Sequence, residues 1–97
     1  MQAMQQNAKA ASDFLKSLAN PHRLAVLCLL LQGEKSVTQL CEVVDISQTS
    51  MSNHLAKLRE EELVGYRREH RTLYYYINNP HVSRIIGVLY DIYCKTK

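Results

Sequence analysis

The sequence has few of the residues that mark nucleotide-dependent or metal-dependent enzymes. Only three glycines occur in 97 residues, which excludes a glycine-rich phosphate loop, and no nucleophile elbow is present. Histidine, cysteine and acidic residues show no metal-ligand spacing. A catalytic site would have to combine His22, Cys41 and His54 with nearby acids, and no spacing supports that arrangement. We therefore predict that the chain is not an enzyme and uses no cofactor.

Cysteine and long apolar segments are also scarce. An odd count of three cysteines argues against a structural disulfide framework, so any disulfide would be regulatory. The longest apolar run, residues 24–31, is far shorter than the roughly 20 residues that cross a bilayer. The first six residues have neither a basic start nor an apolar signal core. These absences predict a cytoplasmic protein without a membrane partner.

The remaining composition is that of an ordinary globular protein, with 46% hydrophobic and 22% charged residues. The chain length predicts one domain over residues 1–97 with a thin core, for which a partner subunit would be useful. A net charge of +3 suits an anionic partner without identifying one.

Three helices are predicted in the first half of the chain. Apolar residues recur at helical spacing over residues 8–18, and Asn20-Pro21 ends that pattern. Pro21 suits the first turn of a second helix, which we expect to end at Gly33 in a left-handed conformation. Ser36 and Gln39 form a capping-box pattern for a short third helix that should end near Asp45.

The second half predicts a polar helix, a hairpin and a final helix. Ser47 is the expected N-cap of a helix whose apolar residues are Met51, Leu55 and Leu58. Segments 64–68 and 72–77 are rich in β-branched residues and tyrosine and predict a β-hairpin, and the last helix follows Pro80. The resulting fold class is mainly α with a small β-hairpin. Its order α-α-α-α-β-β-α is that of a winged helix-turn-helix.

The helix after Ser47 carries an unusual number of short hydroxyl and amide side chains. The major groove of DNA admits one helix, and its base edges are read by such groups. A solvent-exposed surface helix is the alternative, but alanine, glutamate and lysine would serve solvation better than residues that weaken a helix interior. We therefore predict a DNA-binding surface on this helix that comprises Ser47, Gln48, Thr49, Ser50, Ser52, Asn53, His54 and Lys57.

The tip of the predicted hairpin is basic. Arg67, Arg68, His70 and Arg71 would extend the DNA-binding surface by contacting phosphates or the minor groove. The alternative is a hairpin whose exposed edge is protected from aggregation by charge, and Glu69 dilutes the basic patch. The wing interpretation is favoured.

With these features in place, the chain closely resembles the ArsR/SmtB family of bacterial repressors. The resemblance is carried by residues 18–24, by Leu40-Cys41, by Ser47-Gln48 and by residues 53–55. It implies a homodimer built from the first and last helices. It also implies repression by binding to double-stranded operator DNA, which an inducer relieves.

The metal sites of that family are not matched. Cys41 is followed by Glu42 and Val43 instead of the second cysteine of a Cys-x-Cys pair. The positions that correspond to the second family site hold Asn79, His81, Ile92 and Lys95, which do not form a zinc site. The resemblance therefore implies no metal.

The cysteines instead resemble those of the family branch that includes BigR, SqrR and HlyU, which responds to reactive sulfur species or oxidants. This resemblance implies that Cys41 and Cys94 are the redox-sensing pair, whereas Cys28 is expected to be a small core residue. Two alternatives stay open. One is a constitutive DNA-binding module with inert cysteines, and the other is a metal- or haem-responsive regulator.

Overall fold

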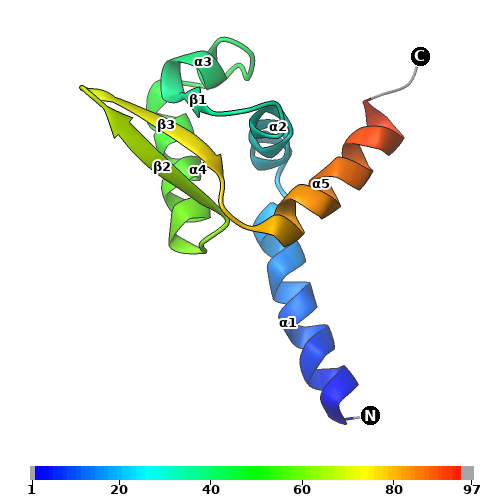
Figure 1. The fold of residues 1–97 in the computed structure, drawn as a ribbon. Coiled ribbons are helices and arrows are strands. Elements are labelled where there is room, and N and C mark those ends of the chain that lie inside the picture. Colours follow the sequence, from blue (N-terminus) through cyan, green and yellow to red (C-terminus); the bar gives the residue numbers. More distant parts are fainter. Residues whose placement is uncertain (1, 95–97) are drawn as a thin grey trace.

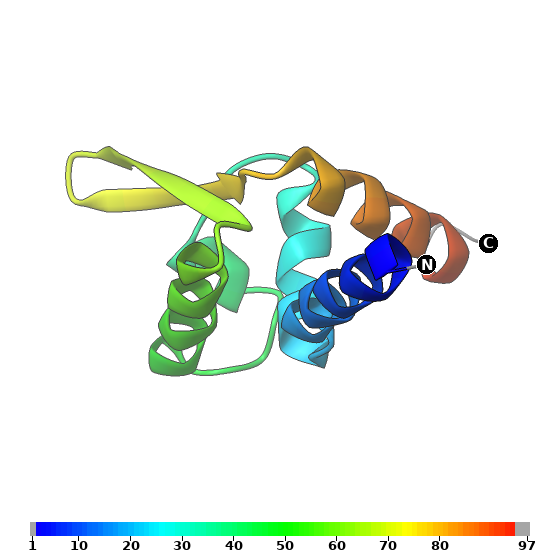
Figure 2. The same cartoon turned by 90° about the horizontal axis from the view of Figure 1, so that it is seen from below.

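The computed structural model describes residues 2–94. The recognisable elements are α1 (Gln2–Leu18), α2 (Pro21–Leu30), β1 (Lys35–Ser36), α3 (Val37–Cys41), α4 (Gln48–Glu60), β2 (Val64–Glu69), β3 (Thr72–Ile77) and α5 (Pro80–Tyr93). Helices α1 and α5 lie on one side of the molecule, and α4 lies on the other with the hairpin of β2 and β3 (Figures 1 and 2). Helix α2 lies between the two sides and packs against α5.

The helix starts follow from the capping residues that the sequence predicts. Asn20 caps α2 by accepting hydrogen bonds from the backbone N–H groups of His22 and Arg23. Ser36 and Gln39 form the predicted capping box at α3. Asn79 accepts from the His81 N–H at the start of α5. These side chains satisfy backbone donors that have no partner within the first turn of a helix.

Two boundaries differ from the sequence prediction. Helix α3 ends at Cys41 rather than near Asp45, so the link to α4 spans residues 42–47. Turn-type hydrogen bonds continue past Cys41, and the Val44 N–H bonds to the Leu40 carbonyl at 2.9 Å. Val44 is therefore buried one turn after Leu40, whereas Val43 faces outward. Helix α2 also ends earlier than expected, at Leu30, although Gly33 does take a positive φ of 136°.

Strand β1 was not predicted. It pairs antiparallel with β3 through Lys35 opposite Tyr75 and Ser36 opposite Tyr74, which gives a sheet of order β1-β3-β2. A strand of two residues is too short to show the alternating pattern from which strands are predicted. It ties the segment before α3 to the middle of β3.

The core lies where α2, α4, the sheet and α5 meet. Its fully buried side chains are Val26, Leu27, Leu40, Met51, Leu55, Leu58, Val64, Val82 and Ile86. Burial of each such side chain stabilises the fold by roughly 1.5–3 kcal/mol. None of the helices within residues 2–94 is both long and apolar enough to span a membrane.

The end of α4 is closed by a Schellman motif in which a glutamate takes the position usual for glycine. The Leu63 N–H bonds to the Leu58 carbonyl at 2.9 Å, and the Glu62 N–H bonds to the Arg59 carbonyl at 2.9 Å. Glu62 has a left-handed φ of 63°, which is strained for a residue with a Cβ atom. The neighbouring Glu61 has an ordinary φ of −90°.

Replacement of Glu62 by glycine should therefore stabilise the fold, by about 1 kcal/mol, because the strain is removed. The matched change Glu61→Gly should destabilise it by about 0.5–1 kcal/mol, because glycine there only adds freedom to the unfolded chain. Urea unfolding monitored by circular dichroism measures both values. A destabilised Glu62→Gly protein would contradict this account of the helix end.

Candidate nucleic-acid interface

Helix α4 divides into a buried face and an exposed polar face. Met51, Leu55 and Leu58 are fully buried and fix the rotation of the helix about its axis. The exposed residues on the remaining surface are Gln48, Thr49, Ser50, Ser52, Asn53 and Lys57, and His54 is half-buried. The predicted surface residues therefore face solvent, with His54 at the border.

The first turn of α4 is held by Ser47. Its Oγ accepts a hydrogen bond from the Ser50 N–H at 3.0 Å, as the sequence predicts for an N-cap. The other N–H groups of the first turn have no partner within the helix, and together with the helix dipole they favour an anionic group. Ser47 and Gln48 are exposed at this end of the helix.

The polar groups of this face are free to bind a ligand. Within residues 2–94, the side chains of Gln48, Thr49, Ser52 and Asn53 make no hydrogen bond to another residue. Amides and hydroxyls supply both donors and acceptors, which is what the edges of base pairs require. The surface therefore has the chemistry for direct contact with the major groove.

The basic residues of the hairpin fall into two groups. Arg68, His70 and Arg71 are exposed at or near its tip, and His70 occupies the turn with a left-handed φ of 59°. Arg67 instead lies within β2, opposite Tyr74, and is held by two carboxylates. Its Nε lies 2.8 Å from Glu34 Oε1, and its Nη1 lies 3.0 Å from Glu69 Oε1. These two carboxylates raise the pKa of Arg67, so the guanidinium stays charged but is already paired.

Tyrosine rings stiffen the hairpin and join it to α4. The rings of Tyr66 and Tyr75 lie 5.6 Å apart, and Tyr75 is buried. The guanidinium of Arg59, in the last turn of α4, lies over the Tyr66 ring at 4.4 Å. The tyrosine-rich run that predicts the hairpin thus also fixes its direction relative to the helix.

His54 lies beside Arg23 and His22 of α2. Burial, then the charge of Arg23, then His22 lower its pKa below the usual value for histidine. The folded state therefore favours neutral His54. Below a pH of about 6.5, His54 is protonated in the unfolded chain to a greater extent than in the folded chain. The free energy of unfolding therefore falls on acidification.

The side chains of Cys28 and Cys94 line the same apolar cavity. Burial raises the pKa of Cys28, and the neighbouring Cys94 thiol raises that pKa further. This neighbourhood follows from the packing of α2 on α5. Cys41 lies on α3, partly buried against the core. Cys28 is likewise partly buried against the core, and the redox roles of the three cysteines stay predictions.

An apolar cavity of about 300 Å³ adjoins this thiol pair. It is lined by Leu24, Ala25, Cys28, Leu89, Tyr93 and Cys94. Apolar walls disfavour a thiolate, and this agrees with the raised pKa of Cys28. Cys94 is exposed at the end of α5 and is open to reagents in solution.

No cluster of three or more histidine, cysteine or acidic side chains capable of holding a metal occurs in the part of the chain that is described. Of the four positions that correspond to the second family metal site, Asn79 caps α5 and Ile92 is an exposed apolar residue. Lys95 lies outside the described residues.

Comparison with known proteins places this geometry among bacterial regulators. The profile of the bacterial regulatory protein, arsR family, matches residues 20–66, which contain α2, α3 and α4. The transcriptional activator HlyU of Vibrio cholerae is 39% identical over 95 residues, which cover 98% of this chain and 88% of HlyU. The biofilm growth-associated repressor of Agrobacterium fabrum is 40% identical over 92 residues, 95% of this chain and 79% of the repressor.

The same relationship holds for the fold. The solved structure of reduced HlyU from Vibrio cholerae superposes with a TM-score of 0.93 and 39% identity. The superposition covers 98% of this chain and 100% of that one. The winged helix-turn-helix architecture is therefore shared over the whole described chain.

The two neighbouring thiols should differ in reactivity. Cys94 is exposed, whereas Cys28 has a raised pKa and therefore a smaller thiolate fraction at neutral pH. Iodoacetamide at neutral pH should modify Cys94 before Cys28, as followed by peptide mass spectrometry. In urea, where burial is lost, the two rates should converge. Faster modification of Cys28 in the folded protein would show that its environment differs from the one described.

Proposed function

The chain belongs to the ArsR family of bacterial regulatory proteins, and we propose that it is a homodimeric repressor that releases its operator when a cysteine pair is oxidised or bridged by sulfur. It is a transcriptional regulator with a DNA-binding fold, and its relatives confirm the prediction that it is not an enzyme. One relative is named an activator and the other a repressor, so repression is part of the proposal.

The observation that carries operator binding is the free polar face of α4. Its side chains are exposed, have no partners among the described residues, and project from a helix whose rotation is fixed by the core. In this proposal the face lies in the major groove, and Gln48 and Asn53 contact base edges. Arg68 and Arg71 reach the phosphates from the wing, whereas Arg67 mainly holds the wing in place.

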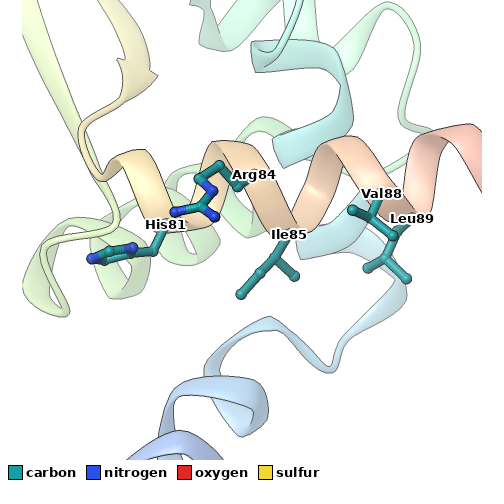
Figure 3. A pocket seen from close by; sticks show the side chains of 5 residues that line it. All are labelled: His81, Arg84, Ile85, Val88 and Leu89. Atoms are coloured by element: carbon teal, nitrogen blue, oxygen red, sulfur yellow. The ribbon is translucent and has the colours of Figure 1, made fainter.

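The dimer is proposed to form through α1 and α5. Leu15 on α1 and Val88, Ile92 and Tyr93 on α5 are more than half exposed although they are apolar. A cavity of about 460 Å³ lies along α5, lined by His81, Arg84, Ile85, Val88 and Leu89 (Figure 3). These helices lie on the side of the molecule away from α4, so a second copy on that side leaves the DNA-binding face free (Figure 2).

The sensing step is proposed to use Cys94 with Cys28, because both side chains line one apolar cavity. Two thiols lose two electrons and two protons when they form a disulfide, and the sulfane sulfur of a polysulfide takes these up and leaves as hydrogen sulfide. Longer bridges retain additional sulfur atoms between the two cysteines. Cys41 with Cys94 is the second candidate pair. A bridge would tie α5 to the body of the fold and change the spacing of the two α4 helices in the dimer.

Alanine substitutions on α4 test operator binding. Gln48→Ala and Asn53→Ala should each weaken binding about tenfold or more, because a bidentate base contact is lost. Affinity is measured by fluorescence anisotropy on the duplex that the wild-type protein selects from a randomised library. Gln32→Ala, an exposed glutamine outside the proposed surface, is the matched control. Unchanged affinity of both α4 variants would refute the proposed surface.

Serine substitutions identify the sensing pair. After treatment with polysulfide, wild-type protein and Cys41→Ser should lose about tenfold in affinity, whereas Cys28→Ser and Cys94→Ser should keep theirs. Intact mass distinguishes loss of two hydrogens from gain of sulfur. If Cys41→Ser and Cys94→Ser both keep their affinity after treatment while Cys28→Ser loses it, the sensing pair is Cys41 with Cys94. Unchanged affinity of the wild type would indicate inert cysteines, and an absorbance band or bound metal in the purified protein would favour the haem or metal alternative.

A further inference from the structure

Arg23, in the first turn of α2, contacts two other helices through its side chain. Its Nη1 donates to the backbone carbonyl of Ser17, in the last turn of α1, at 3.1 Å. Its Nε donates to Nδ1 of His54, in the middle of α4, at 3.5 Å. The Arg23 backbone N–H is itself held by the Asn20 cap at 3.1 Å. One side chain therefore joins the proposed dimer helix to the proposed reading helix.

This arrangement determines which nitrogen of His54 carries the hydrogen. A guanidinium has only donors, so the nitrogen that faces Arg23 must accept and must be unprotonated. In a neutral imidazole the hydrogen then resides on Nε2. No residue among those that the structure describes accepts a hydrogen bond from His54 Nε2. His54 consequently presents an unused donor beside the exposed face of α4.

The groups that face His54 keep it neutral. Arg23 and His22 come from α2, with the His22 ring centroid 5.7 Å from that of His54 and the rings inclined at 55°. Helix α1 contributes the uncharged Ser17 carbonyl, which binds the same Arg23. A proton on Nδ1 would remove the acceptor of Arg23 and place two cations in contact. The neutral Nε2–H form is therefore the one that is compatible with the contacts of Arg23 to α1 and α4.

We propose that Arg23 is a positioning residue that fixes His54 as a neutral hydrogen-bond donor, and that His54 Nε2–H donates to a phosphate oxygen of the operator. This rests on the proposed operator binding. A phosphate is preferred to a base edge because His54 is half-buried at the border of α4, whereas the fully exposed residues extend farther toward the groove. The opposite tautomer would direct a lone pair at the phosphate and repel it.

Nuclear magnetic resonance of the free protein tests the tautomer without DNA. Long-range nitrogen–proton spectra of the full chain should show His54 only as the Nε2–H form, whereas exposed His81 shows a mixture. In Arg23→Met, which has no donor, His54 should become a mixture of the two tautomers, and its pKa should rise toward the ordinary value for histidine. An Nδ1–H form, or spectra unchanged by the Arg23 substitution, would overturn the positioning role.

Two amide substitutions test the donor toward DNA. The amide nitrogen of His54→Gln lies near the place of Nε2, whereas that of His54→Asn lies near the place of Nδ1. On the duplex selected by the wild type, His54→Gln should stay within about threefold of wild-type affinity and His54→Asn should lose about tenfold. His22→Gln, which removes the neighbouring imidazole, should bind like wild type. Circular dichroism verifies that each variant is folded.

The outcomes separate this inference from the function on which it rests. Equal affinities of the two His54 variants, while Gln48→Ala and Asn53→Ala weaken binding, would overturn the donor role and leave operator binding standing. If the wild-type protein selects no duplex, operator binding itself fails, and the role of His54 toward phosphate fails with it.

Discussion

The packing of one face of α4 determines what the rest of the molecule can do. Met51, Leu55 and Leu58 have no exposed surface, and a rotation of the helix by even a quarter turn would bring hydroxyls and amides into the core. The cost of burying those unpaired groups is what keeps the polar face directed outward. The surface chemistry of α4 is therefore a consequence of its hydrophobic packing, although the two involve different residues.

Helix α2 contacts both sides of the molecule. It packs against α5 and carries Cys28, which lines a cavity together with Cys94. Its first turn also carries Arg23, which hydrogen-bonds to both α1 and α4. In the proposed function, the dimer helices α1 and α5 lie on one side of α2, the reading helix α4 lies on the other, and α2 itself carries one of the sensing cysteines. A small displacement of α2 would move both the dimer helices and the reading helix, because packed interiors move as units instead of deforming continuously.

The helices and the hairpin could be predicted because their signals are local. Asn20-Pro21, Ser36 with Gln39, Ser47 and Asn79-Pro80 each mark a helix start within a few residues, and the tyrosine-rich run marks a strand. The features that were missed depend on contacts between distant parts of the chain. Cys28 and Cys94 line one cavity only because α2 docks on α5. Arg67 forms an ion pair with Glu34, which lies 33 residues earlier in the chain. Strand β1 exists only because β3 is there to pair with it.

The ion pairs of Arg67 affect how strongly the affinity for DNA depends on ionic strength. A cation that neutralises a DNA phosphate displaces a condensed counterion, and the number displaced sets how steeply affinity declines with added salt. Arg67 already has the carboxylates of Glu34 and Glu69 as its counterions, so it has little to displace. Operator affinity should decline less steeply with salt than the number of arginines in the wing implies, and more of the recognition would then depend on contacts that salt does not screen.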